Sequence, residues 1–349
     1  MKIQDAHISF DLEKQTLIIA ELSGNHNHDL NFVMKSIKAA KEAGADAVKS
    51  QTYTPDTITL NVKNKFFTIK QDSIWDDRTF YDLYQEAYTP WEWQPKMQKY
   101  CHELGMIFFS SAFDRSAVDF LEKMHVPAHK IASPEITDIP LIKYAASKKK
   151  PMFFSTGIAE LKDIKLALET STKEGNRNIA FLKCTTAYPT PLEEVNLRTI
   201  PKMKALFHTV VGLSDHTIGF SVATASIPLG AQIIEKHFIL DKKIGGPDAS
   251  FSMEPKNFFQ MTKAVREIEK ALGKVSFSLT EHQKKSRQGA RSLFVAVDMD
   301  KGEIFTEKSL RSVRPNYGLH PKYFRNILGK KASRKIRAGT PLSWELVQK

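Results

Sequence analysis

The chain has 349 residues, of which 42% are hydrophobic and 26% are charged. This composition is ordinary for a globular protein and excludes a disordered, collagen-like or coiled-coil chain. The net charge is +12, and nearly all of it comes from the residues after position 283, where 16 are basic and 5 acidic. This basic segment suggests binding to an anionic ligand, an acidic partner surface or nucleic acid. The alternative is a solvated basic face without a partner.

Short β-rich apolar runs alternate with helical patterns through the first 275 residues. The predicted strands are Leu17–Glu21, Ala47–Gln51, Ile107–Ser111, Lys130–Ala132, Met152–Ser155, Ile179–Cys184, Val210–Ser214 and Ile233–His237. Predicted helices include Asn31–Ala43, Trp91–Leu104, Ser116–Met124, Leu141–Ala146, Glu193–Leu206, Phe220–Leu229 and Phe258–Leu272. Strands that alternate with helices in this way predict an α/β fold, a parallel (β/α)₈ TIM barrel over residues 1–280.

Two segments depart from this alternation. The connection from Thr52 to Thr89 is too long for one β-to-α step and is rich in Asp, Tyr, Phe and Trp. Because the loops after the strands build the active site of a TIM barrel, we expect this insertion to cover the site. After Leu272, strand-like runs at 293–297 and 303–306 and a turn-rich segment at 314–321 predict a small β-rich domain over residues 289–349.

The carboxyl ends of the predicted strands are unusually polar for the end of a barrel that holds catalytic side chains. Lys49 and Lys130 each lie at a strand end, and both would point toward the same mouth. With the hydroxyl groups of Ser111, Ser133 and Ser214 they would form a cradle for a small phosphate and carboxylate dianion. An internal salt bridge is the alternative role for either lysine alone.

Two histidines point to a metal ion. His216 and His237 lie at the ends of the seventh and eighth predicted strands, so their imidazoles could converge on one ion. Two histidines completed by water and substrate oxygens suit Mn²⁺ or a similar labile divalent ion better than structural zinc. Asp215 and Glu235 could orient the imidazoles or help bind the substrate. The alternative is that both histidines are hydrogen-bonded core residues.

Three more residues at this edge have open roles. Glu21 suits acid–base chemistry or hydroxyl binding, and a glutamate at a strand end can also cap a helix. The segment 245–255 begins with two glycines and places Asp248 near the mouth, but it contains no nucleotide-binding glycine motif. Cys184 could be a nucleophile, although a buried inert thiol fits its position better.

Compartment and partners follow from simpler features. Two cysteines, Cys101 and Cys184, are too few for a disulfide framework, and the first ten residues hold no apolar stretch of the secretory kind. We therefore expect a cytoplasmic protein. The longest charge-free stretch, 217–234, is interrupted by glycine, proline and hydroxyl side chains, so we expect no membrane span.

Eight strings, in chain order, resemble the sialic acid synthase family over nearly the whole chain: AELSGNHN, VKSQ, KIASPE, CTTAYPTP, GLSDHTIG, EKHF, GGPD and RPNYGLHP. The resemblance implies an antifreeze-like (SAF) domain after the barrel. It also implies an enzyme that condenses phosphoenolpyruvate with an acetamido sugar in its open aldehyde form. Two positions depart from the family pattern: His28 stands where NHxG usually has glycine, and Ser50 replaces a common phenylalanine.

The resemblance also implies a role for each matching position. The phosphoenolpyruvate-binding residues would be Lys49, Ser111, Lys130, Ser133, Thr186 and Ser214. Glu21 and Glu135 would be catalytic and stabilise positive charge developing at C2. The sugar would be bound by Gln51, Tyr188, Asp248 and the partner subunit's Arg314. His216 and His237 would hold Mn²⁺, with Mg²⁺ or Co²⁺ as alternatives, in a domain-swapped homodimer that binds neither nucleic acid nor membrane.

Within the family, the segments around KIASPEITDIP, GGPDASFSMEP and RSVRPNYGLHP look most like the pseudaminic acid branch. Pro134 and Ala249 stand where neuraminate synthases typically have glycine and histidine. The acceptor would then be 2,4-diacetamido-2,4,6-trideoxy-altrose, whose methyl group needs an apolar wall that the sequence does not locate. The alternative is an N-acetylneuraminate or legionaminic acid synthase that uses a mannose-series acetamido sugar.

Two readings from other classes remain. A metal-free barrel aldolase or keto-acid synthase would not consume phosphoenolpyruvate. A protein whose basic tail binds nucleic acid would show salt-sensitive affinity for DNA or RNA. The tail contains no nucleic-acid-binding motif, which disfavours the second reading.

Overall fold

The computed structural model describes residues 1–70 and 73–348. The chain divides into two compact units, Met1–Gly273 and Lys274–Lys349. The sequence predicts domains over 1–280 and 289–349. In the structure, residues 274–288 belong to the second unit, and they include the helix α11 (Glu281–Ser286). Residues 71 and 72 of the predicted insertion and residue 349 of the second domain lie outside the described residues.

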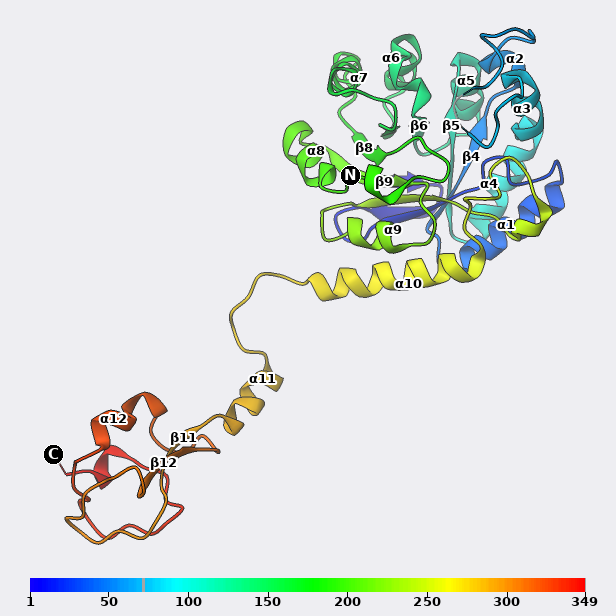
Figure 1. The fold of residues 1–349 in the computed structure, drawn as a ribbon. Helices are drawn as coiled ribbons and strands as arrows, with labels where there is room; N and C mark the ends of the chain where they lie inside the picture. The colour runs from blue at the N-terminus through cyan, green and yellow to red at the C-terminus, as the bar shows by residue number, and fades with distance from the viewer. Residues whose placement is uncertain (71–72, 349) are drawn as a thin grey trace. The chain divides into compact units, whose positions relative to one another are not determined.

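A closed barrel forms the centre of the first unit (Figure 1). Within the described residues, eight parallel strands follow one another around it in the order β10, β3, β4, β5, β6, β7, β8, β9. Their bounds are β3 (Leu17–Glu21), β4 (Ala47–Thr52), β5 (Ile107–Ala112), β6 (His129–Ile131), β7 (Met152–Ser155), β8 (Ile179–Cys184), β9 (Val210–Asp215) and β10 (Ile233–His237). The predicted TIM barrel and its strands are confirmed, with ends that shift by no more than one residue.

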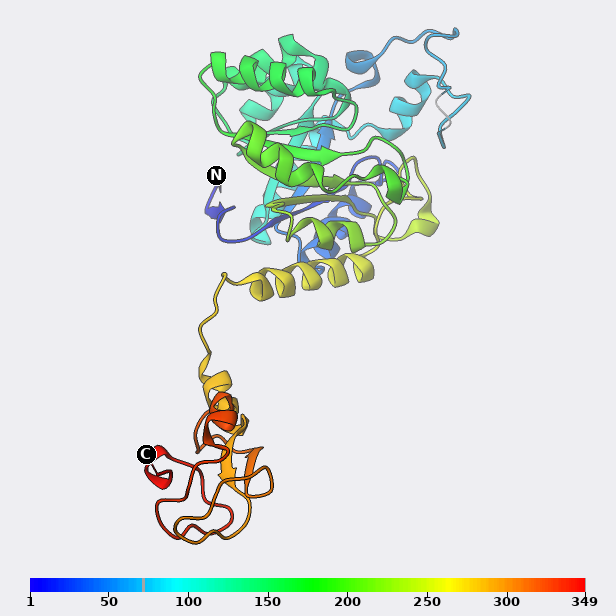
Figure 2. The ribbon, with the colours of Figure 1, turned by 60° about the vertical axis from the view of Figure 1, so that its left-hand side comes forward.

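Helices surround the barrel (Figure 1 and Figure 2). They are α1 (Leu30–Glu42), α4 (Gln94–Glu103), α5 (Arg115–Lys123), α6 (Ile139–Ser147), α7 (Leu161–Lys173), α8 (Thr199–Phe207), α9 (Ser221–Ser226) and α10 (Pro255–Leu272). In α1, Val33, Ile37 and Ala40 are buried, which is the spacing of one helical face. The helix predicted from Glu193 was too long, because Asn196 has a φ of 51° and α8 begins only after it.

The core of the barrel is apolar below its mouth. Phe109 and Phe153 pack edge to face with ring centroids 5.5 Å apart. A hairpin that the sequence did not predict, β1 (Lys2–Asp5) and β2 (Ile8–Asp11), adds Ile3 to this core. Asp5 of the hairpin accepts a hydrogen bond from the Phe108 backbone N–H near the start of β5. The hairpin therefore covers the amino ends of the strands, opposite the predicted site.

The predicted insertion forms α2 (Pro55–Ile58) and α3 (Phe80–Ala87) between β4 and α4. Its Trp75 Nε1 donates to the Pro247 carbonyl at 2.9 Å, in the loop after β10. Close to the end of α3, the Glu86 carbonyl lies 2.9 Å from His28 Nε2, in the loop after β3. The insertion therefore lies against loops at the carboxyl end of the barrel.

The second unit has a small core of its own. Its strands β11 (Ser292–Val295) and β12 (Leu310–Val313) pair antiparallel, and a short helix, α12 (Phe324–Ile327), follows. The strand predicted at 303–306 was wrong: Ile304 makes one isolated bridge, and a turn closed by the Thr306 and Ser309 side chains follows at once. Among the described residues of both units, no helix has the length and apolar character that crossing a bilayer requires.

Candidate active site

Strand register brings the predicted polar residues together at the carboxyl end of the barrel. Glu21 of β3 pairs with Lys49 of β4, and Ser111 of β5 pairs with both Gln51 of β4 and Lys130 of β6. Successive strands of the barrel therefore place these side chains side by side. Because alternate residues of a strand face the same side, the same register that builds the apolar core below also builds this polar layer.

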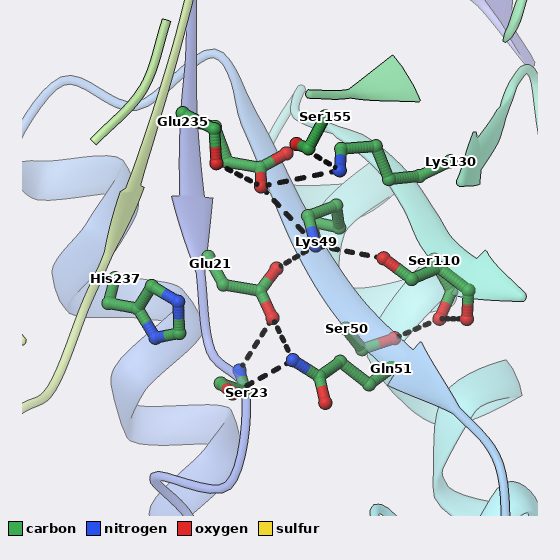
Figure 3. A network of polar contacts seen from close by, with 12 residues as sticks. Glu21, Ser23, Lys49, Ser50, Gln51, Ser110, Lys130, Ser155, Glu235 and His237 are labelled. Carbon is green, nitrogen blue, oxygen red and sulfur yellow. Dashed lines mark hydrogen bonds and ion pairs between the residues drawn. The ribbon is translucent and has the colours of Figure 1, made fainter. Parts of the chain in front are cut away.

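Lys49 is the centre of this layer (Figure 3). Its Nζ atom lies 2.6 Å from Glu21 Oε2 and 3.6 Å from Glu235 Oε1, and it donates to Ser111 Oγ at 3.0 Å. Both Lys49 and Glu21 are buried. The internal salt bridge considered as an alternative for a single lysine is therefore present, but it belongs to a larger cluster.

Lys130 approaches the same cluster from β6. Its Nζ atom donates to Ser155 Oγ at 2.7 Å and lies 3.8 Å from Glu235 Oε1. Ser214 Oγ donates to the same Glu235 oxygen at 3.3 Å. Glu235 thus contacts both lysines, as Figure 3 shows. Ser155 was missed by the sequence reasoning, although it ends a predicted strand as the other site residues do.

Burial and charge compete in this cluster. Burial raises the pKa of Glu21, and Lys49 offsets it only in part. Burial also disfavours charge on Glu235, but Lys130 and Lys49 together outweigh it and lower the pKa of that carboxyl. For Lys130 burial prevails over Glu235 and lowers the pKa of the ammonium. A bound dianion would give both lysines a further partner in a site where charges interact strongly.

Neither Asp215 nor Glu235 makes a hydrogen bond with His216 or His237, although orienting the imidazoles was one role considered for them. Asp215 Oδ2 lies 2.7 Å from Lys236 Nζ, and its other oxygen accepts from Thr217. Glu235 faces the lysines, so its role near the ligand is the one that the geometry supports. His216 Nδ1 instead lies 3.1 Å from the Thr185 carbonyl.

A second group of hydroxyls lies beside a glycine. Thr186 Oγ1 donates to Ser133 Oγ at 3.1 Å, and the Ile158 backbone N–H donates to the same oxygen at 3.0 Å. A Cβ atom on Gly157 would lie 2.0 Å from Thr186 Oγ1 and 2.6 Å from Ser133 Oγ. Only glycine leaves room for both hydroxyls here. The sequence reasoning missed Gly157, and its place just after a strand was the available signal.

Glu135 follows β6 in a short 3₁₀ helix, Pro134–Thr137. Its Oε2 atom is buried and has no hydrogen-bond partner among the described residues. Burial raises the pKa of Glu135 to about 7, although Lys130 favours the charged form. A carboxyl group that titrates near neutral pH at the mouth of a barrel is a candidate for catalysis.

The two predicted metal ligands lie together at the ends of β9 and β10. The ring centroids of His216 and His237 are 5.2 Å apart. His237 Nδ1 is buried and makes no hydrogen bond with any described residue. Burial and the neighbouring His216 hold the pKa of His237 well below its usual range, so its imidazole is neutral, as a metal ligand must be.

This donor set fits a divalent ion that takes its other ligands from water or substrate. The contact of His216 Nδ1 with the Thr185 carbonyl leaves Nε2 for an ion, an arrangement typical of metal-bound histidine. Within residues 1–70 and 73–348, no group of three or more His, Cys, Asp or Glu side chains is placed to hold a metal. A closed structural zinc site is thus not formed by these side chains.

The predicted sugar-binding residues divide between the two units. Gln51 Nε2 donates to Ser23 Oγ at 2.9 Å, and Ser23 Oγ in turn donates to Asp248. Tyr188 packs on His216 with ring centroids 4.5 Å apart. Arg314 is exposed just after β12, in the second unit.

The structure also describes three further positions that the sequence analysis discussed, His28, Ser50 and Cys184. His28 has a φ of 50°, a conformation that glycine adopts without strain, which accounts for the glycine usual at this position. Ser50 donates to Ser110 Oγ at 3.1 Å. Cys184 is buried with its sulfur 3.9 Å from His216 Nδ1.

Comparisons with known proteins found similar sequences and folds over nearly the whole chain. Residues 36–277 match the NeuB family and residues 290–348 match the SAF domain. The chain is 46% identical to the pseudaminic acid synthase of Campylobacter jejuni subsp. jejuni serotype O:23/36 (strain 81-176), over 96% of this chain and 97% of the other. It is 34% identical to the N,N'-diacetyllegionaminic acid synthase of Legionella pneumophila, over 95% and 94%. The solved structure of the Bacillus subtilis spore coat polysaccharide biosynthesis protein spsE, 34% identical, superposes with a TM-score of 0.67 and covers 100% and 99% of the two chains.

Proposed function

The chain belongs to the NeuB family, and we propose that it condenses phosphoenolpyruvate with 2,4-diacetamido-2,4,6-trideoxy-altrose and water to give pseudaminic acid and phosphate. The observation that carries this proposal is the identity of 46% over nearly the full length to a pseudaminic acid synthase. The alternative function is that of a legionaminic acid synthase. The chain is 34% identical to one such enzyme over a similar length.

In this proposal the lysine cluster binds phosphoenolpyruvate. Lys49 and Lys130 supply two positive charges around Glu235, and Ser111 and Ser214 supply hydroxyl groups to the same layer. Ser133 and Thr186, beside Gly157, form a pair of hydroxyls for the phosphate. Charged hydrogen bonds of this kind are about twice as strong as neutral ones, which suits a small, highly charged substrate.

The sugar binds beside it. Gln51 and Asp248, which both contact Ser23, would hydrogen-bond hydroxyl or acetamido groups. A divalent ion on His216 and His237, Mn²⁺ in our proposal with Mg²⁺ or Co²⁺ as alternatives, would polarise the sugar aldehyde as a Lewis acid. Both cysteines are buried and unpaired, which supports a reducing, cytoplasmic compartment as part of the proposal.

The reaction forms one carbon–carbon bond and replaces the C2–O bond to phosphate by a C2–O bond to a water oxygen. The two protons of that water end on the former aldehyde oxygen and on the released phosphate. C3 of phosphoenolpyruvate attacks the aldehyde carbon, and positive charge develops at C2. Ionised Glu21 and Glu135 stabilise that charge, and a water oxygen adds to C2. The tetrahedral hemiketal then loses phosphate through cleavage of its C2–O bond, which leaves the 2-keto acid. Lys49 and Lys130 hold the phosphoenolpyruvate carboxylate and phosphate throughout.

The direct test follows inorganic phosphate released by the purified protein. We expect release only when phosphoenolpyruvate and the diacetamido-altrose are both present, because attack by C3 precedes the loss of phosphate. Phosphate release without the sugar would indicate a phosphatase. No phosphate release when both substrates are present would contradict the proposed reaction.

We further propose that two copies pair so that Arg314 of the partner subunit reaches the sugar. Arg314 is exposed on the second unit, which is basic. A reactive intermediate needs a site from which water is excluded. In a two-fold dimer, the second unit of each copy would close the active site of the other copy.

Mixed dimers test this arrangement. We expect Arg314→Ala and His237→Ala homodimers to be nearly inactive. When the two variants are co-expressed, one site of a mixed dimer carries both defects and the other carries neither. Random pairing should then return roughly a quarter of the wild-type activity, because half the dimers are mixed and half their sites intact. A verified mixed dimer without recovery would show that Arg314 acts within its own chain.

A further inference from the structure

Three aromatic rings form a cluster at the barrel mouth, and two of them contact the histidines. Tyr188 lies 4.5 Å from His216, and Phe251 lies 4.9 Å from His237, measured between ring centroids. Tyr188 and Phe251 are themselves 5.0 Å apart. Trp75 packs against Tyr188 at 5.3 Å and Phe251 at 6.4 Å. We refer to Trp75, Tyr188 and Phe251 as the aromatic wall.

Each ring of the aromatic wall comes from a different loop. Tyr188 follows β8, Phe251 lies in the loop after β10, and Trp75 belongs to the insertion after β4. The hydrogen bond from Trp75 Nε1 to the Pro247 carbonyl, 2.9 Å long, fixes the indole against the loop that carries Asp248. Phe251 is buried, whereas Tyr188 and Trp75 are only half-buried. The two half-buried rings keep surface that a ligand can cover.

The rings lie in a definite order from the histidines outward. Tyr188 and Phe251 contact the imidazoles, and Trp75 contacts Tyr188 and Phe251 but neither imidazole among the described ring contacts. In the proposed reaction the aldehyde carbon lies at the histidines. The first substituents of the sugar chain therefore meet Tyr188 and Phe251, and the substituents further along the chain meet Trp75.

We propose that Trp75 is a specificity-determining residue, which covers the C4 acetamido and C6 methyl groups of the sugar with the face of its indole ring. This inference rests on the proposed function. At C4 the diacetamido-altrose carries an acetamido group, which ends in an apolar methyl, where N-acetylmannosamine has a hydroxyl group. At C6 it carries a methyl group where the other sugar has a hydroxymethyl group.

An aromatic face separates these two sugars through hydration. A methyl group against the indole loses no hydrogen bonds with water, and it gains the burial of apolar surface. A hydroxyl group in the same place loses water and finds no replacement, because the indole N–H already donates to the Pro247 carbonyl. Differences of this kind change the specificity constant by about 10- to 200-fold.

The test compares Trp75→Ala with the wild type on three substrates. We expect the variant to lower kcat/KM for the diacetamido-altrose by about 10- to 100-fold, mainly through a higher KM for that sugar. The KM for phosphoenolpyruvate should stay within about twofold, and kcat/KM for N-acetylmannosamine should change little, because that sugar gains little from the wall. The ratio between the two sugars is the decisive number.

Two further variants separate the wall from the hydrogen bond. Trp75→Phe keeps an aromatic face without the N–H donor and should keep most of the preference. Trp75→Gln keeps a donor but puts an amide at the wall, so it should lose the preference, and it serves if Trp75→Ala does not fold. The matched control is Ile74→Ala, whose side chain is 50% exposed in the same segment. It should leave the ratio between the two sugars and the KM for phosphoenolpyruvate unchanged.

The outcomes distinguish the two claims. A wild type that prefers the diacetamido-altrose, with Trp75 variants that keep this preference, overturns the role of Trp75 and leaves the proposed function intact. An equal rise in the KM of phosphoenolpyruvate would show that Trp75 only braces the loops. A wild type that uses N-acetylmannosamine alone overturns both claims.

Discussion

His237→Ala is expected to lower turnover by about three orders of magnitude, because a Lewis acid at the aldehyde supplies several kcal/mol of transition-state stabilisation. The side chain has a buried Nδ1 atom without a hydrogen-bond partner in the described part of the chain, next to a second imidazole. Chelation of the wild type should have the same effect. Added Mn²⁺ should restore the chelated wild type but not the variant.

The measurement is phosphate release together with the metal content of each protein. His282→Ala is the matched control, since His282 is exposed on α11 in the second unit, and it should keep both activity and metal. Full activity of a metal-free preparation, or of His237→Ala itself, would exclude the ion from the reaction.

Glu135→Gln should reduce kcat by about 10²- to 10³-fold, the usual cost of removing one group that stabilises charge in the transition state. The wild-type rate should fall as the pH is lowered through about 7, because burial raises the pKa of Glu135 to about 7 and only the ionised carboxylate stabilises positive charge. Lys130 lowers this pKa in part, and Asp138 raises it further. Tyr84 and Tyr188 also lie close enough to interact with the carboxylate.

The same pKa shift predicts an effect of opposite sign on stability. Glu135 takes up its proton more readily in the folded chain than in the unfolded chain, where its pKa is 4.5. Ionisation therefore costs folded-state stability as the pH rises from about 4.5 to above 7, by up to about 3 kcal/mol. We expect Glu135→Gln to unfold at a higher temperature than the wild type at pH 8, and at nearly the same temperature at pH 4.5.

These two readouts separate catalysis from folding. A less active but more stable Glu135→Gln, whose remaining activity lacks the limb near pH 7, is the predicted result. An unchanged pH profile in the variant would assign that limb to another group and contradict the role of Glu135.

Periodicity in the sequence was sufficient to predict the barrel. The strands from β3 to β10 are short apolar runs with polar ends, and that pattern predicted both their bounds and the edge where Lys49, Lys130 and the two histidines meet. The predicted histidine pair is also brought together, because the strands that carry His216 and His237 are neighbours in the barrel.

The interactions within the site depend on contacts that periodicity does not describe. Glu235 contacts two lysines because strands distant in sequence close the barrel. Gly157 has no side chain, and its lack of a Cβ atom leaves the space that the Ser133 and Thr186 hydroxyls occupy. Trp75 joins the mouth from an irregular insertion, whose path no repeating pattern predicts. The hairpin β1–β2 is too short to give a periodic signal of its own.

The most direct test of the proposed function is a competition assay read by mass spectrometry. The purified protein with Mn²⁺ receives phosphoenolpyruvate and equal amounts of the diacetamido-altrose, its mannose-series relative and N-acetylmannosamine. The two diacetamido products have the same mass, so each is compared by chromatography with the product of a single-sugar reaction. We predict that pseudaminic acid forms first and in excess. N-acetylneuraminate or the legionaminic acid product as the main product would contradict the proposed function and place the chain in another branch of the family.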